Sequence, residues 1–272
     1  MQFPLPLVRL TRIPVRYGRR VAPRTIRRYA GIVTLGLMLI AWQLLVMSKA
    51  FPSYQLPAPA AVWAEFVDWF GSGRLWPHIW TTVVEVLSGL GFGVLFAVAL
   101  GYVIAHSPLL DDVLSPIIVT LQSTPVVAYA PLLVIWFPGI TSKTITSALI
   151  VFFPMLMSTV VGIRNVPPTL VDLMRVSQAT RRQMFVKLEV PAAMPVLLTG
   201  LKTAATLSVI GAVVGELING SAGLGHLVRL GLSQYDIPLV FVAVILLATL
   251  ALSLYRLVTM MERRLLRWQQ FE

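Results

Sequence analysis

The chain has 272 residues, of which 57% are hydrophobic and only 12% are charged. A soluble globular domain has about 45–50% apolar and about 25% charged residues, so this composition excludes an ordinary soluble protein. Because the chain contains no cysteine, disulfides, thiol nucleophiles and thiolate metal sites are excluded as well. The composition, with a mean hydropathy of +0.82, indicates an integral membrane protein.

Stretches without charged residues predict where the chain crosses the membrane. A helix rises about 1.5 Å per residue and the hydrocarbon core is about 30 Å thick, so roughly 20 residues span it. Five uncharged stretches of 19 to 30 residues meet this requirement, and a sixth apolar stretch contains Lys202 and Glu216. The predicted fold class is therefore an all-α integral membrane protein with six transmembrane helices, at residues 29–47, 82–106, 113–137, 142–163, 192–217 and 238–261.

Positive charges predict the orientation, because loops rich in lysine and arginine stay in the cytoplasm. The first 28 residues contain eight arginines and no acid, and further basic residues follow the fourth and sixth predicted spans. Both termini are thus expected in the cytoplasm. The chain divides into a basic cytoplasmic arm (1–28), a six-span domain (29–261) with an internal cytoplasmic loop (165–190), and a cytoplasmic tail (262–272).

The arginine arm suits anionic lipid headgroups, and nucleic-acid binding is not expected of a six-span protein. A cleaved signal peptide is an alternative interpretation of the arm and first span, since Ala58-Pro59-Ala60 imitates a cleavage site. The 28-residue basic region and the 19-residue apolar run are both long for such a signal.

The third predicted span combines three prolines with polar side chains. Gln122, Ser123 and Thr124 lie between Pro116 and Pro125, and Pro131 follows. Each proline removes a backbone donor and tends to kink a helix. Two interpretations stay open: the polar residues line a translocation pathway, or their hydroxyls merely satisfy the freed carbonyl groups.

Ionisable side chains at membrane depth are further pathway candidates, because burying a charge there is costly. Glu216 and Asn219 lie near the outer end of the fifth predicted span, and Glu85 near the outer end of the second. The alternative is that these side chains reach the membrane interface, where the cost disappears. Lys202, near the inner end of the fifth span, is expected to anchor at the headgroups.

The loop at residues 165–190 predicts two short amphipathic helices joined by a turn at Gln178-Ala179. Thr169 precedes Asp172 by three residues, and Thr180 precedes Gln183 by three, which are two capping-box spacings. Pro191 is expected to end the second helix. The apolar faces of these helices suggest docking onto another surface, although an interfacial pair lying on lipid has the same pattern.

This loop resembles a known sequence element. Residues 172–180 read Asp-Leu-Met-Arg-Val-Ser-Gln-Ala-Thr, and residues 185–195 read Phe-Val-Lys-Leu-Glu-Val-Pro-Ala-Ala-Met-Pro. Together they resemble the EAA loop of ATP-binding-cassette importer permeases, which typically reads Glu-x-Ala-x-x-x-Gly, followed by a leucine-proline pair. Two positions depart from that pattern: Asp172 replaces the glutamate and Gln178 replaces the glycine. If the turn needs a positive φ, the glutamine carries a conformational cost.

The resemblance covers roughly residues 50–268. Within the family, the chain is similar to the nitrate/sulfonate/taurine branch, especially to permeases for thiamine-precursor pyrimidines or riboflavin. Leu56-Pro57-Ala58-Pro59 and Gly223-Leu224-Gly225 belong to it. It implies import of a small organic solute, such as a pyrimidine thiamine precursor or a riboflavin-like compound. The alternative within the same machinery is a sulfonate, taurine or nitrate anion.

The same resemblance implies an inner (plasma) membrane location in a bacterium and several partners. These are cytoplasmic ATPase subunits that bind ATP and magnesium, a second permease copy, and an extracytoplasmic substrate-binding protein. The loop would act as a coupling helix seated in the ATPase, and no cofactor is expected in this chain. The residues implied in coupling are Asp172, Arg175, Gln178, Ala179, Thr180, Phe185, Lys187 and Pro191.

Catalytic and metal-binding motifs are not found in the sequence. A phosphate-binding loop needs the pattern G-x-x-x-x-G-K-[ST], and the segment from Gly139 to Thr144 lacks the second glycine. The three histidines fall in separate segments, so neither a metal site nor a catalytic site is predicted. An ion-coupled secondary transporter is the alternative from another class, but the halves show no convincing inverted repeat.

Overall fold

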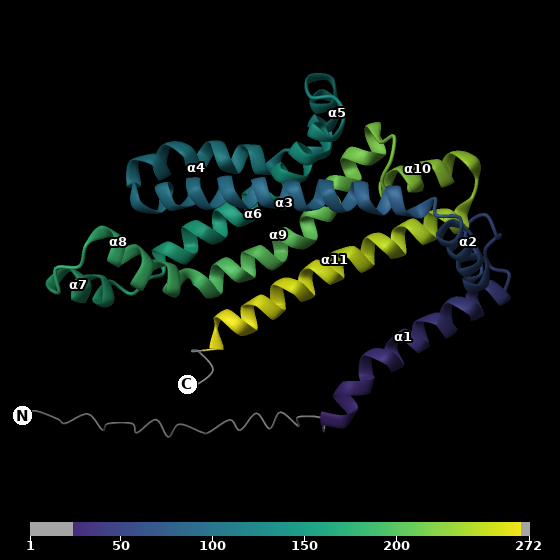
Figure 1. Cartoon of the computed structure of the whole chain (residues 1–272), viewed down its shortest axis with the longest axis horizontal. Helices are drawn as coiled ribbons and strands as arrows, with labels where there is room; N and C mark the ends of the chain where they lie inside the picture. Colours follow the sequence, from purple (N-terminus) through teal and green to yellow (C-terminus); the bar gives the residue numbers. More distant parts are fainter. Residues whose placement is uncertain (1–23, 268–272) are drawn as a thin grey trace, which may run out of the picture. The chain divides into compact units, whose positions relative to one another are not determined.

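The computed structural model describes residues 24–267, and this part of the chain is helical throughout, without strands (Figure 1). The chain divides into two compact units, Met1–Ala50 and Phe51–Glu272. The first unit contributes one described helix, α1 (Arg24–Met47), whose apolar part is Gly31–Met47. The predicted basic arm lies largely outside the described residues, and so do residues 268–272 of the predicted C-terminal tail.

Four helices of the second unit are long and apolar enough to cross a membrane: α3 (Leu75–His106), α6 (Ile140–Arg164), α9 (Val190–Asn219) and α11 (Ile237–Leu265). They correspond to the second, fourth, fifth and sixth predicted spans. The helix α6 packs between α3 and α9, and α11 packs on α9. Small residues permit the close approach: a Cβ atom on Gly93 of α3 would lie 2.8 Å from the carbonyl oxygen of Ala148 in α6.

The third predicted span is not one kinked helix. The structure has two helices there, α4 (Pro108–Ser123) and α5 (Val126–Trp136), which are bent by 92° at the break between them. Thr124 is extended, with φ −87° and ψ 127°, because the ring of Pro125 disfavours a helical conformation in the preceding residue. Pro116 and Pro131 lie inside the two helices without breaking them. The bundle therefore has four apolar helices of spanning length, or five when the bent pair counts as one span.

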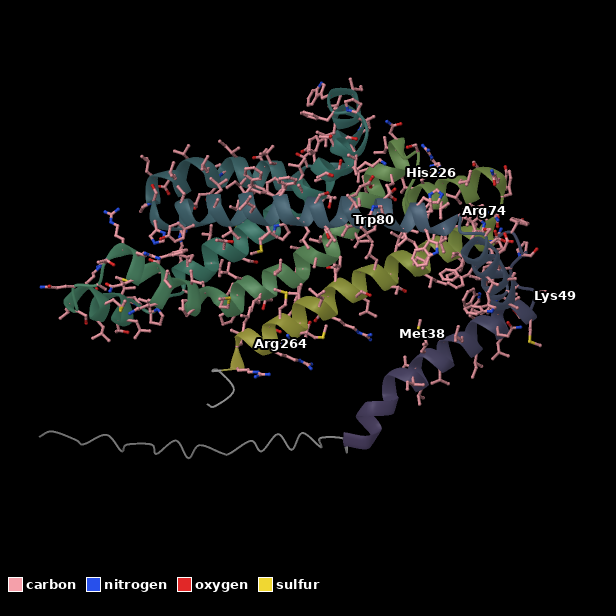
Figure 2. The ribbon with its side chains drawn as sticks, in the orientation of Figure 1. Met38, Lys49, Arg74, Trp80, His226 and Arg264 are labelled. Carbon is pink, nitrogen blue, oxygen red and sulfur yellow. The ribbon has the colours of Figure 1, made fainter. Side chains whose placement is uncertain are left out.

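Short helices mark the two ends of the bundle (Figure 1). At one end, here called the α10 end, lie α2 (Pro59–Gly71) and α10 (Leu224–Gln234). At the other, the α7–α8 end, lie α7 (Pro168–Val176), α8 (Arg181–Met184) and the π-helix η1 (Phe185–Glu189). His226, Trp80 and Arg74 lie at the α10 end, whereas Arg264 lies near the far end of α11 (Figure 2). An apolar cluster that includes Trp69, Leu75, Leu227 and Leu239 packs the α10 end.

Candidate functional site

The loop at the α7–α8 end consists of two short helices with a turn at Gln178-Ala179, as the sequence predicts. Gln178 has a φ of 53°, and the amide of Ala179 donates to the carbonyl oxygen of Met174 at 3.0 Å. The turn thus adopts the left-handed conformation that glycine tolerates best. Gln178, which stands where the family typically has glycine, therefore carries the conformational cost of this turn.

We expect Gln178→Gly to stabilise this turn by about 0.5–1 kcal/mol, because glycine populates positive φ without a Cβ clash. Hydrogen exchange of the Ala179 amide, which reports the turn, should slow about two- to five-fold. Gln178→Ala is the matched control, since alanine keeps the Cβ atom. Equal exchange rates in the glycine and alanine variants would contradict this account of the turn.

Of the two capping boxes predicted for the helices of the loop, one is present and the other is not. Thr180 and Gln183 form the predicted capping box: the Gln183 amide donates to Thr180 Oγ1 at 3.3 Å, and the Thr180 amide donates to Gln183 Oε1 at 2.8 Å. The first predicted capping box is wrong. The helix α7 starts at Pro168, one residue before Thr169, without a side-chain cap. Proline fits the first helical turn because it has no N–H to satisfy.

Pro191 does not end the second helix, contrary to prediction. One helix runs without a break from Arg181 to Asn219, through α8, η1 and α9. A proline inside an α-helix clashes with the carbonyl group four residues earlier, here that of Lys187. Lys187 lies in the π-helix, whose wider turn accommodates the ring. The loop is consequently joined to α9 by continuous helix, not by a flexible link.

Most of the residues implied in coupling are exposed on this loop. Asp172 and Arg175 form an ion pair at 3.4 Å with both side chains about 70% exposed (69% and 72%). Apolar side chains are also exposed here, among them Leu173 at 61% and Val176 at 82%. The rest of the described chain leaves this apolar and charged surface uncovered. The exposed coupling residues are Asp172, Arg175, Gln178, Thr180, Phe185 and Lys187, whereas Ala179 and Pro191 are half-buried.

A polar contact that the sequence did not indicate ties the loop to α3. Glu189 of η1 accepts a hydrogen bond from the hydroxyl of Tyr102 at 3.0 Å and pairs with Nε2 of His106, also at 3.0 Å. The Phe185 ring meets the Tyr102 ring edge-on, at 5.2 Å between centroids. The loop is therefore joined to α9 through continuous helix and to α3 through the contacts of Glu189. No local pattern links residues so far apart in the sequence.

The predicted pathway residues on α4 lie at the bend and face outward from this chain. Gln122 and Ser123 are exposed, and Thr124 is half-buried. Ser123 Oγ donates to the carbonyl oxygen of Val119 at 2.7 Å, and Thr124 Oγ1 donates to that of Thr120 at 3.2 Å. These bonds match the alternative in which the hydroxyls satisfy helix carbonyls. The bonds do not exclude pathway lining, so Gln122, Ser123, Thr124 and the exposed Asn219 all stay pathway predictions.

The acidic candidates are in a different environment from the one expected. Glu216 of α9 and Glu85 of α3 are both fully buried inside the bundle at the α10 end, which overturns the interfacial alternative for them. Lys143 of α6 is also buried, and its Nζ lies 2.9 Å from Glu85 Oε1. Near the other end of α9, Lys202 pairs with Glu262 of α11 at 2.5 Å, a contact that the sequence did not indicate.

Comparison with known proteins places the chain in a family. Residues 89–267 match the family model described as binding-protein-dependent transport system inner membrane component, which is more than half of the chain. The chain belongs to this family. Its members are permease subunits of ATP-binding-cassette transporters, which are not catalytic; ATP hydrolysis takes place in a partner ATPase.

Named relatives match over most of the chain. The riboflavin transport system permease RibX of Chloroflexus aurantiacus is 41% identical over 238 residues, 87% of this chain and 89% of that protein. The formylaminopyrimidine transport permease ThiX of Halalkalibacterium halodurans is 30% identical, over 86% of this chain and 93% of its own length. The taurine permease TauC of Escherichia coli is 29% identical, over 87% and 88%.

A solved structure matches the fold. The MetNI methionine ABC transporter, in an inward-facing conformation, superposes with a TM-score of 0.61 at 19% sequence identity. The match covers 70% of this chain and 95% of that chain. At this identity the likeness concerns the arrangement of helices alone.

Proposed function

We propose that the chain, paired with a second copy of itself, forms the translocation pathway of an ATP-driven importer in a bacterial inner membrane. The observation that carries this proposal is the exposed α7–α8 surface, joined to α9 by one continuous helix. This surface would dock onto a partner ATPase that binds ATP and magnesium. Movement of the ATPase would then shift the surface between two positions. An extracytoplasmic binding protein would deliver the solute at the α10 end.

The proposed topology has six spans, formed by α1, α3, the bent pair α4 and α5, α6, α9 and α11. The basic residues of the arm and of the α7–α8 loop support a cytoplasmic location for both termini and for the α7–α8 end. The α10 end then faces outward. In this arrangement the coupling surface is on the same side of the membrane as ATP.

The orientation is testable because the chain has no cysteine. Exposed serines at the two ends, Ser177 and Ser233, allow single-cysteine variants that add one reactive thiol each. In intact spheroplasts a membrane-impermeant maleimide should label Ser233→Cys, whereas Ser177→Cys should react only after the membrane is opened. Labelling of Ser177→Cys from outside would refute the proposed orientation.

The solute proposed is a riboflavin-like or pyrimidine compound. The support is the identity to RibX, which exceeds that to ThiX and TauC over similar lengths. Taurine, sulfonates or nitrate are the alternative for the same machinery. The test is ATP hydrolysis by the chain reconstituted with its ATPase and binding protein, across a panel of these solutes.

Stimulation by riboflavin or a pyrimidine would support the proposed solute, whereas stimulation by taurine or nitrate alone would overturn it and keep the importer. Solute uptake that needs an ion gradient and no ATP would overturn the importer itself and favour a secondary transporter.

A further inference from the structure

Two buried carboxyl groups lie beside each other at the α10 end of the bundle. Glu85 of α3 and Glu216 of α9 are both 0% exposed, and their carboxyl groups interact directly. Lys143 of α6 is the one buried cation among the residues whose burial is described, and its Nζ lies 2.9 Å from Glu85 Oε1. Four elements meet at this cluster, because the start of α10 also contacts Glu216.

Both carboxyl oxygens of Glu216 accept hydrogen bonds. Its Oε1 accepts from the hydroxyl of Thr82 at 2.6 Å, and its Oε2 accepts from the amide of Gly225 at 2.5 Å. The Thr82 oxygen itself accepts from the amide of Leu224 at 2.8 Å, so its own hydrogen points to Glu216. Hydrogen bonds to both oxygens favour the charged form of a carboxyl group.

Glu85 is bonded differently. Within residues 24–267 its Oε2 receives no hydrogen bond from any donor, although the atom is completely buried. Buried polar atoms in proteins almost always have a partner. The neighbours of this carboxyl group are Lys143 on one side and Glu216, already an acceptor, on the other. Two carboxyl oxygens that both act as acceptors cannot form a hydrogen bond with each other. A proton between the carboxyl groups of Glu85 and Glu216 would provide the missing donor.

The charge count leads to the same conclusion. If both carboxyl groups were ionised, the cluster would hold two negative charges against one lysine, away from water. An uncompensated buried charge costs several kcal/mol, and two carboxyl groups that share a site do not both ionise readily. One proton removes the excess charge and supplies the missing hydrogen.

Other ionisable groups at this end do not supply that hydrogen. His78 of α3 accepts from the amide of Gly223 through Nδ1 at 3.1 Å. On α10, Nδ1 of His226 is 2.8 Å from the carbonyl oxygen of Gly220, and Arg229 donates to the same oxygen at 2.5 Å. A metal ion fits poorly, since both oxygens of Glu216 are already occupied and the described residues contain no group of three metal-ligating side chains.

We propose that Glu85 and Glu216 form a proton-binding site, in which Glu85 carries the proton and donates it to the Glu216 carboxylate. The cluster is then neutral: one lysine cation, one carboxylate and one carboxylic acid. It fastens the start of α10 to α3, α6 and α9 through Thr82, Glu216 and Gly225.

The test is infrared spectroscopy of the purified chain at neutral pH. A protonated carboxylic acid has a C=O stretching band separate from the carboxylate and amide bands, and the wild-type chain should show one such band. Glu85→Gln should abolish the band. Glu216→Gln should abolish it as well, because Glu85 then ionises against Lys143. Lys143→Met should retain the band, since removing the cation does not favour loss of the proton.

The matched control is Glu65→Gln, which removes a half-buried glutamate of α2 and should leave the band unchanged. The wild-type spectrum can refute the proposal even if a cluster variant fails to fold. Absence of the band in the wild-type chain would overturn the proposal. A band that persists in both Glu85→Gln and Glu216→Gln would overturn it too, because the proton would then belong to another residue.

Discussion

Reversing the charge of Asp172 is expected to detach the ATPase and abolish solute uptake while leaving the helical bundle folded. The side chain is 69% exposed, and within the described residues it forms an ion pair with the similarly exposed Arg175. Surface ion pairs contribute about 0–1 kcal/mol, so Asp172→Lys costs the fold little. The new lysine would stand beside Arg175 and replace the negative charge of Asp172 with a positive one, on a loop that already carries Arg181, Arg182 and Lys187.

The expected loss of affinity follows from measured charge pairs at protein interfaces. Disrupting one partner of a buried interfacial charge pair costs about 2–5 kcal/mol, which is at least about 30-fold in affinity. We therefore expect ATPase co-purification with Asp172→Lys to fall by at least about 30-fold, and uptake with it. The measurement is the ratio of ATPase to permease recovered from detergent, alongside the melting temperature of the permease.

Two control variants sharpen this experiment. Asp172→Glu restores the residue that the family typically has and should bind the ATPase at least as well as the wild-type chain. Asp68→Lys reverses an exposed aspartate of α2 at the opposite end of the bundle and should leave ATPase binding unchanged. Normal co-purification of Asp172→Lys would remove the coupling role from this loop and favour the lipid-bound alternative.

The sequence predicted the long helices well because their signal is local. Charge-free stretches of sufficient length predicted α6, α11 and most of α3, and α9 followed from an apolar stretch of spanning length although it contains Lys202 and Glu216. The break in the third predicted span was not predictable in the same way. Pro116, Pro125 and Pro131 have the same local chemistry, and only Pro125 breaks the helix. The packing of α4 and α5 against other helices therefore determines at which proline the helix breaks.

The polar sites were predictable only in part, for the same physical reason. The turn at Gln178-Ala179 and the Thr180 capping box depend on a few neighbouring residues and could be predicted from spacing, whereas the positive φ of Gln178 was left open by the sequence. The burial of Glu216 depends on groups from α3, α6 and α10, so the sequence alone left its environment open. Pro191 was misjudged because a π-helix, formed in the tertiary context, removed the clash that ends an ordinary helix.

Removing the carboxylate of Glu189 is expected to uncouple ATP hydrolysis from transport. This side chain is only 13% exposed and accepts from Tyr102 while pairing with His106, so it joins the coupling loop to α3. Glu189→Ala leaves the continuous helix into α9 intact but removes the connection to α3. A lost buried hydrogen bond costs about 1–3 kcal/mol, which is enough to separate the movement of the two helices.

The measurement for Glu189→Ala is solute transported per ATP hydrolysed in proteoliposomes, with ATPase binding measured in parallel. We expect the transport ratio to fall about ten-fold, which corresponds to about 1.4 kcal/mol of lost coupling, while the ATPase stays bound. Tyr102→Phe deletes one hydrogen bond and should cause a smaller loss in the same direction. Asp112→Ala, an exposed acidic residue at the same end, is the control. An unchanged transport ratio in Glu189→Ala would mean that the motion reaches α3 through its packing against α6, because that contact is the more extensive one.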